Sequence, residues 1–133
     1  MKWHKLLLAL GMLAAASAAL ATPATDELFA RYKSAGAAGF DAERGSKNWN
    51  REVQGEAGEM VSCTACHGKD LGKEGRHRKT DKVIKPMAPS VNKERYTDAK
   101  KIEKWFKRNC NDVWSRECTA QEKGDLLKFL LGQ

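Results

Sequence analysis

A short segment in the middle of the chain, Cys-Thr-Ala-Cys-His at positions 63–67, restricts what the rest of the sequence can fold into. Two cysteines three positions apart reach both vinyl groups of one haem when the chain between them turns helically, and the pattern marks this attachment. The histidine directly after the second cysteine then lies beneath the iron. The motif therefore predicts one covalently attached haem c, bound through Cys63 and Cys66, with His67 as an axial iron ligand.

Two other kinds of site also use a Cys-x-x-Cys pair. A zinc site needs two further ligands at matching spacing, and a thiol–disulfide redox pair usually lies in a βαβ setting. The residues around the motif offer neither context, which favours haem. A ligating histidine usually donates its other ring proton to an acceptor. Residues 87–90 resemble the loop of small cytochromes c in which a proline carbonyl accepts this proton, and we expect Pro89 to do so.

The first 21 residues have the features of a secretory signal peptide. Lys2 and Lys5 give a charged start, residues 6–20 are apolar or small, and Ala19-Leu20-Ala21 is a cleavage site. About 15 apolar or small residues fall short of the roughly 20 that a membrane-spanning helix needs. We therefore expect a mature chain of residues 22–133 that forms one domain, is exported to the periplasm and has no stable membrane insertion.

The charge of the chain indicates what kind of partner it meets. Loss of the signal segment lowers the formal net charge from +7 to +5, because the segment carries two lysines and no acid. Acids and bases are interspersed, and no dense arginine patch with interleaved aromatic residues is present, which argues against nucleic-acid binding. Basic residues are densest between positions 73 and 85. Such a surface suits docking to an acidic redox partner.

The spacing of apolar residues predicts short helices and no alternating strand pattern of convincing length. A first helix is expected from Asp26 to about Ala35. Later helices are expected to begin at Asp41, a plausible N-cap, after Thr97-Asp98, and at Thr119. At the last of these, Glu122 completes a capping box. The predicted fold is all-α, with short helices wrapped around a cofactor.

The ligand on the other side of the iron decides the function. Two methionines follow the signal segment, and Met60 lies three residues before Cys63, too close to reach the opposite haem face. Met87 is a better candidate, although it lies in the proline loop assigned to the histidine side. His77 is a further candidate, but its basic, glycine-bounded loop predicts that it is solvated.

Asn109 is the unusual residue of the predicted helix after Asp98. The apolar stripe of this helix consists of Ile102, Trp105, Phe106 and Val113. Asn109 falls on the same stripe, so a continuing helix directs it inward, where an unsatisfied amide is costly. Asn109 either caps the helix end in a left-handed conformation or coordinates the iron through its carbonyl oxygen. Periodicity alone favours the cap.

Residues 108–111 (RNCN) and 116–119 (RECT) closely resemble the oxygen-binding cytochromes c called SHP, the sphaeroides haem protein family. Residues 87–90 (MAPS) and 95–98 (RYTD) also look like its pattern, and the similarity covers nearly the whole chain after the signal segment. The resemblance implies a small class I-like cytochrome c fold around one covalently bound haem. It also favours iron ligation by Asn109 over the helix cap.

In that family the asparagine before the first disulfide cysteine is the second haem ligand, which corresponds to Asn109 here. The two later cysteines, which can pair in an oxidising compartment, form a disulfide in the family, which implies a bridge between Cys110 and Cys118. An amide oxygen suits ferric iron better than ferrous iron. The resemblance accordingly implies that Asn109 leaves on reduction, so that the ferrous haem binds O2, NO or CO, with electrons supplied by redox-partner cytochromes.

The alternative function is a plain electron-transfer cytochrome c with permanent His/Met ligation by Met87. The sequence shows no distal acid–base pair. It leaves open whether the protein is an enzyme, and it favours an electron-transfer and diatomic-ligand-binding haem protein.

Overall fold

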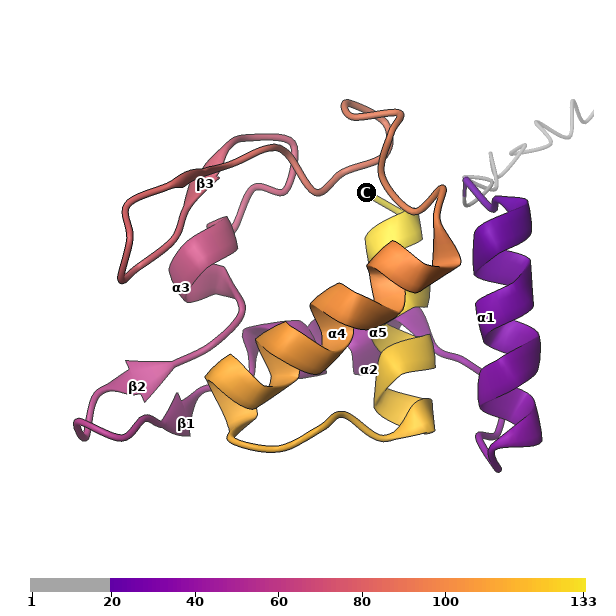
Figure 1. The fold of residues 1–133 in the computed structure, drawn as a ribbon, viewed down its shortest axis with the longest axis horizontal. Coiled ribbons are helices and arrows are strands. Elements are labelled where there is room, and N and C mark those ends of the chain that lie inside the picture. Colours follow the sequence, from indigo (N-terminus) through magenta and orange to yellow (C-terminus); the bar gives the residue numbers. More distant parts are fainter. Residues whose placement is uncertain (1–19) are drawn as a thin grey trace, which may run out of the picture.

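The structure is a computed structural model that describes residues 20–133, so nearly all of the predicted signal peptide at residues 1–21 lies outside it. Five helices dominate the described chain (Figure 1): α1 (Pro23–Ser34), α2 (Ala42–Asn50), α3 (Thr64–His67), α4 (Ala99–Trp114) and α5 (Ala120–Leu131). The strands form two antiparallel hairpins: β1 (Val53–Gln54) with β2 (Met60–Val61), and β3 (Gly75–Arg76) with β4 (Val83–Ile84). The predicted all-α class is confirmed. No helix within residues 20–133 is long and apolar enough to cross a bilayer.

Side-chain caps determine where the longer helices begin. The three later predicted starts are confirmed by caps at Asp41, Asp98 and Thr119. The first helix begins earlier than predicted, at Pro23 rather than Asp26, because Thr22 and Thr25 form a capping box there. Each of these side chains accepts a hydrogen bond from a backbone N–H group that the first helical turn leaves without a partner.

The length of α4 corrects one of the two interpretations of Asn109. The helix continues to Trp114 and is followed by Ser115, whose φ of 55° and ψ of 26° are left-handed. Ser115 therefore occupies the capping conformation that the sequence had favoured for Asn109. Asn109 instead lies in the body of the helix, where its side chain serves no capping role.

The core lies where α1 and α2 pack on α5, with α4 packed on α1. Leu28 of α1 and Leu127 of α5 are fully buried. The approach of α2 to α5 is closest at Gly45, where an added Cβ would lie 2.0 Å from the backbone oxygen of Asp125. No larger residue fits at Gly45 without separating the two helices.

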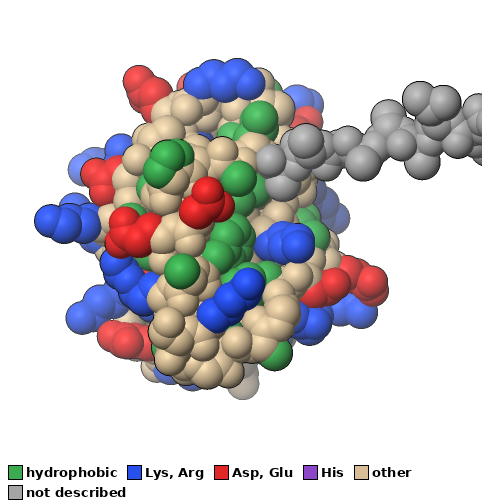
Figure 2. Space-filling view, turned by 90° about the vertical axis from the view of Figure 1, so that its right-hand side faces the viewer, with side chains coloured by type: hydrophobic (Ala, Val, Ile, Leu, Met, Phe, Trp, Pro, Cys, Tyr) green, Lys and Arg blue, Asp and Glu red, His purple; other side chains and the backbone are tan. Residues whose placement is uncertain are grey.

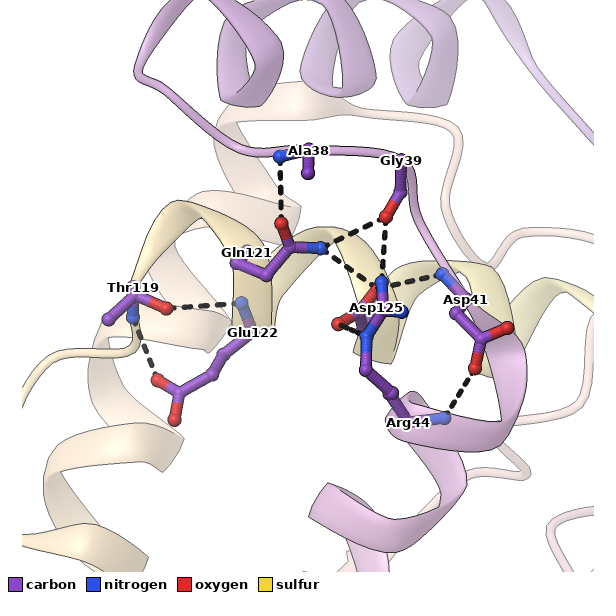
Figure 3. A network of polar contacts seen from close by, with 8 residues as sticks. All are labelled: Ala38, Gly39, Asp41, Arg44, Thr119, Gln121, Glu122 and Asp125. Carbon is purple, nitrogen blue, oxygen red and sulfur yellow. Dashed lines mark hydrogen bonds and ion pairs between the residues drawn. The ribbon is translucent and has the colours of Figure 1, made fainter.

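A buried carboxylate strengthens this contact between α2 and α5 (Figure 3). Asp125 is 2% exposed and accepts hydrogen bonds from the backbone N–H of Asp41 at 2.7 Å and from Nε2 of Gln121 at 3.1 Å. The guanidinium of Arg44 donates to both carboxylate oxygens at 2.9 Å. Asp125 thus binds the first turn of α2 to the middle of α5 through charge-assisted bonds.

Replacing Asp125 by alanine should lower the free energy of unfolding by about 3 kcal/mol, since it leaves several donors without an acceptor. The matched control is Glu27→Ala, which removes a carboxylate paired with Arg31 at 2.6 Å, both side chains being more than half exposed. That change should cost about 0.5 kcal/mol or less. Urea unfolding of the three proteins measures both effects, and equal losses would contradict this account of Asp125.

Candidate haem site

The motif predicted for haem attachment forms one helical turn. The backbone N–H groups of Cys66 and His67 both donate to the carbonyl oxygen of Cys63, at 3.4 and 3.2 Å. Gly68 ends α3 with a φ of 72°, a left-handed conformation that favours glycine. Cys63 precedes this turn as the N-cap of α3 and Cys66 lies within it, and both are free cysteines.

The ring of His67 is buried against Trp49, with 5.1 Å between the ring centroids. Burial, helped by the positive charge of Arg95, lowers the pKa of His67 to about 4. The imidazole is therefore neutral at neutral pH, which is the form that coordinates a metal. Its Nδ1 atom is buried and has no hydrogen-bond partner among the described residues. The expected hydrogen bond to the carbonyl of Pro89 is thus not formed in this structure.

The environment of Cys63 differs from that of a redox-active thiol. Burial raises the pKa of the Cys63 thiol to about 11, whereas the attacking thiol of a redox pair has a lowered pKa. In residues 20–133 no group of three or more His, Cys, Asp and Glu side chains could hold a metal ion. A neutral buried imidazole one residue after the second of two free thiols fits a covalently attached haem.

The β3–β4 hairpin packs directly on the motif. An added Cβ at Gly75 would lie 2.2 Å from the carbonyl oxygen of Cys66 and 2.9 Å from Cα of His67. The strand backbone therefore lies against the backbone of α3, at a distance that only glycine allows.

The loop that carries Met87 is hydrogen-bonded to the segment that follows His67. The backbone N–H groups of Met87 and Ala88 both donate to the carbonyl oxygen of Leu71, four residues after His67, at 2.9 Å. The hydroxyl of Tyr96 donates to the carbonyl oxygen of Met87, also at 2.9 Å. The backbone of this loop is thus bonded to the segment that follows the motif.

Asn109 of α4 lines a cavity of about 280 Å³ between that helix and the β3–β4 hairpin. The other polar lining groups come from both elements: His77, Thr80, Lys82, Arg108 and Asp112. Asn109 is half-buried. His77, predicted to be solvated, is also half-buried and faces the same cavity, with its Nδ1 atom accepting from the backbone N–H of Thr80 at 3.2 Å.

Cys110 and Cys118 lie on either side of the turn between α4 and α5. Their Cα atoms are 5.6 Å apart and their sulfur atoms are within bonding distance, a separation typical of a disulfide. Both residues are buried. A bridge here would fasten the residue after Asn109 to the start of α5.

A larger cavity of about 490 Å³ lies elsewhere, against α1. Figure 2 views the molecule from that side and shows apolar side chains among charged ones. Its apolar lining includes Phe29, Phe40 and Leu131. None of the predicted site residues borders it, so it is not part of the haem site.

Two residues of the site were not singled out from the sequence: Trp49 and Arg51. Trp49 packs on His67, and its only sequence signal is its place four residues after Gly45, on the same face of α2. The guanidinium of Arg51 stacks on the ring of Trp114, 4.0 Å from its centroid. This pair joins segments more than 60 positions apart, and no local pattern predicts such a contact.

Two comparisons with known sequences bear on this site. A family described as Domain of unknown function (DUF1924) matches residues 35–130. The cytochrome c-type protein SHP of Cereibacter sphaeroides is 44% identical over 123 residues, which cover 88% of this chain and 95% of that protein.

Solved structures of similar proteins agree with the sequence comparison. Oxidized SHP, described as an oxygen-binding cytochrome c, superposes with a TM-score of 0.74 and 44% identity over 82% of this chain and 96% of that one. A solution structure of cytochrome c″ from Methylophilus methylotrophus, concerned with haem-ligand detachment, gives a TM-score of 0.69 and 30% identity over 82% and 93% of the two chains. The fold of the described chain is thus that of these small cytochromes.

The packing of the hairpin on α3 makes Gly75→Ala a test of the attachment site. Because the added methyl group would displace the backbone of Cys66 and His67, we expect a loss of about 1–3 kcal/mol in stability and less covalently bound haem per chain. Gly39→Ala is the control, since a Cβ there meets nothing within 4 Å. Haem content and thermal unfolding of the purified proteins measure the effect. Equal values for both variants would contradict the close contact.

Proposed function

We propose that Asn109 and His67 are the axial ligands of the ferric haem in this chain, which belongs to the SHP-type family of c-type cytochromes. We also propose that Asn109 leaves the iron on reduction. The chain carries one covalently attached haem, and Cys63 and Cys66 are the attachment points. The haem supplies electron transfer and, once Asn109 has left, an open position for a diatomic ligand such as O2, NO or CO.

The position of Asn109 in α4 is the observation that carries this proposal. The residue faces the cavity from the body of a helix, so it has no role at the helix end. Asn111, two positions later, donates to the carbonyl oxygen of Lys107 at 2.6 Å. No comparable hydrogen bond engages the amide of Asn109 within the described residues. Its oxygen is therefore available to a ligand partner.

The chemistry of the amide explains why it would leave. A neutral oxygen donor binds ferric iron in preference to ferrous iron, so reduction weakens the bond that Asn109 makes. The cavity holds hydroxyl, carboxylate and guanidinium groups on Thr80, Asp112 and Arg108, and it has room for water. These groups can form hydrogen bonds with the released amide of Asn109, which lowers the free-energy cost of its leaving the iron.

Cys110 and Cys118 would limit the motion to the side chain. A disulfide between them ties the residue after Asn109 to the start of α5. The backbone of α4 then stays in place when the amide moves. We therefore propose that the bridge keeps Asn109 within reach of the iron for reoxidation.

The contacts of Met87 speak against permanent His/Met ligation. Its backbone is hydrogen-bonded to Tyr96 and to Leu71, four residues after His67. These hydrogen bonds hold the backbone of Met87 beside the segment that follows His67, which supports placing Met87 on the His67 side of the haem. Nothing in its surroundings favours the alternative of a plain electron carrier.

Export and partner docking complete the proposal. Cleavage after Ala21 would leave Thr22 in place, whose hydroxyl donates to the carbonyl oxygen of Tyr96 at 2.6 Å and which caps α1. We propose that the mature protein is periplasmic. Electrons arrive from partner cytochromes that dock on the exposed lysines of the β3–β4 hairpin and its flanks: Lys73, Lys79, Lys82 and Lys85.

Optical spectra with and without carbon monoxide test the ligand assignment. We expect a six-coordinate ferric protein and a ferrous protein that binds carbon monoxide. Asn109→Ala should convert the ferric spectrum to one lacking the second protein ligand. Asn111→Ala is the matched control and should change neither spectrum, because that amide is bonded to Lys107.

Each contrary result removes a distinct part of the proposal. A ferric spectrum unchanged by Asn109→Ala would exclude Asn109 as the ligand. A reduced wild-type protein that stays six-coordinate and ignores carbon monoxide would exclude release on reduction. If Met87→Leu alters the ferric spectrum and Asn109→Ala does not, the protein is a plain electron carrier with His/Met ligation.

A further inference from the structure

Two neighbouring hydrogen-bond donors, one on the residue after α2 and one on the last residue of α4, are buried without acceptors. Nε of Arg51 and Nε1 of Trp114 have no partner within the part of the chain that the structure describes. The two groups are stacked, with the guanidinium carbon 4.0 Å from the indole centroid. A buried donor without an acceptor costs about 1–3 kcal/mol, so two adjacent ones indicate an acceptor that belongs between them.

The charges around this pair indicate that the acceptor is an anion. Arg116 also stacks on Trp114, at 5.3 Å, and donates to both carboxylate oxygens of Glu122 at 2.8 Å. These hydrogen bonds lower the pKa of Glu122 to about 2. Arg51 reaches the same carboxylate only at 3.5 Å. Two guanidinium groups thus share one carboxylate, which leaves one positive charge without a close partner.

The pair also lies at the edge of the haem site. Arg51 follows α2, and its charge opposes the burial that raises the pKa of the Cys63 thiol. Trp49, two positions earlier, packs on His67 and has its own buried Nε1 atom without a partner in the described chain. The end of α4 lies beside the junction of α2 and β1 (Figure 1).

We propose that Arg51 and Trp114 together bind one propionate carboxylate of the haem. A haem brings two such carboxylates, and each accepts short, charge-assisted bonds from N–H donors. One propionate would satisfy both orphan donors and balance the remaining charge of Arg51.

This contact has two consequences. Pairing a haem propionate with Arg51 would favour the ferrous state, because an unbalanced carboxylate on the haem would stabilise ferric iron. Trp114 is the last residue of α4, so the bond also ties the helix that carries Asn109 to the cofactor. The proposal rests on the covalent haem and holds whichever residue occupies the second axial position.

Resonance Raman spectra and redox titration of the holoprotein test the proposal. Arg51→Gln and Trp114→Phe should both shift a propionate bending band, since each removes one N–H donor. Arg51→Gln should also move the ferric–ferrous equilibrium toward ferric by about threefold to tenfold, where tenfold equals 59 mV for one electron. Arg51→Lys should keep the wild-type potential while shifting the band.

The control is Arg31→Gln, which removes the same charge from the exposed surface of α1 and should change neither readout. If the propionate band is unchanged in both Arg51→Gln and Trp114→Phe, at wild-type haem content, the proposal is overturned. Arg51 and Trp114 then stack on one another without binding the haem. If either variant fails to retain haem, a crystal structure of the wild-type holoprotein decides. Propionate oxygens within about 3.2 Å of both donors support the contact, and greater separations overturn it. The axial ligands are identified separately from electronic spectra.

Discussion

The close contact of α2 with α5 at Gly45 sets the geometry on which the haem site depends. The helices meet without an intervening side chain, and the buried carboxylate of Asp125 fixes their register. From this contact α2 leads through Trp49 toward the attachment motif, while α5 is joined to α4 next to Cys118. The two walls of the site, α3 with His67 and α4 with Asn109, are therefore both connected to this helix pair.

The two walls differ in how tightly they are held. On the motif side the backbone of β3 touches α3 at Gly75, and the Met87 loop is bonded to the chain after His67. On the other side a single half-buried amide faces a cavity with polar lining. A fixed ligand opposite a replaceable one is the arrangement that a haem needs to bind small molecules in one redox state only. The proposed function depends on this asymmetry more than on any single residue.

Local signals in the sequence predicted what depends on a few neighbouring residues. The attachment motif, three of four helix starts and the all-α class follow from spacing and from capping side chains. Asn109 was placed on the inward stripe, and the helix cap that periodicity alone favoured for it was wrong, because α4 continues to Trp114 and is capped at Ser115. The cavity that His77 shares with Asn109 and the stacking of Arg51 on Trp114 bring together segments that are distant in the sequence. No periodicity encodes such contacts.

Crystal structures of the ferric holoprotein, before and after reduction in the crystal, test the central claim most directly. The account predicts that the side-chain oxygen of Asn109 is about 2.0–2.3 Å from the ferric iron and has moved into the adjoining cavity in the ferrous protein, with His67 unmoved. Met87 or His77 bound to iron in both states, or Asn109 bound in both, would contradict it.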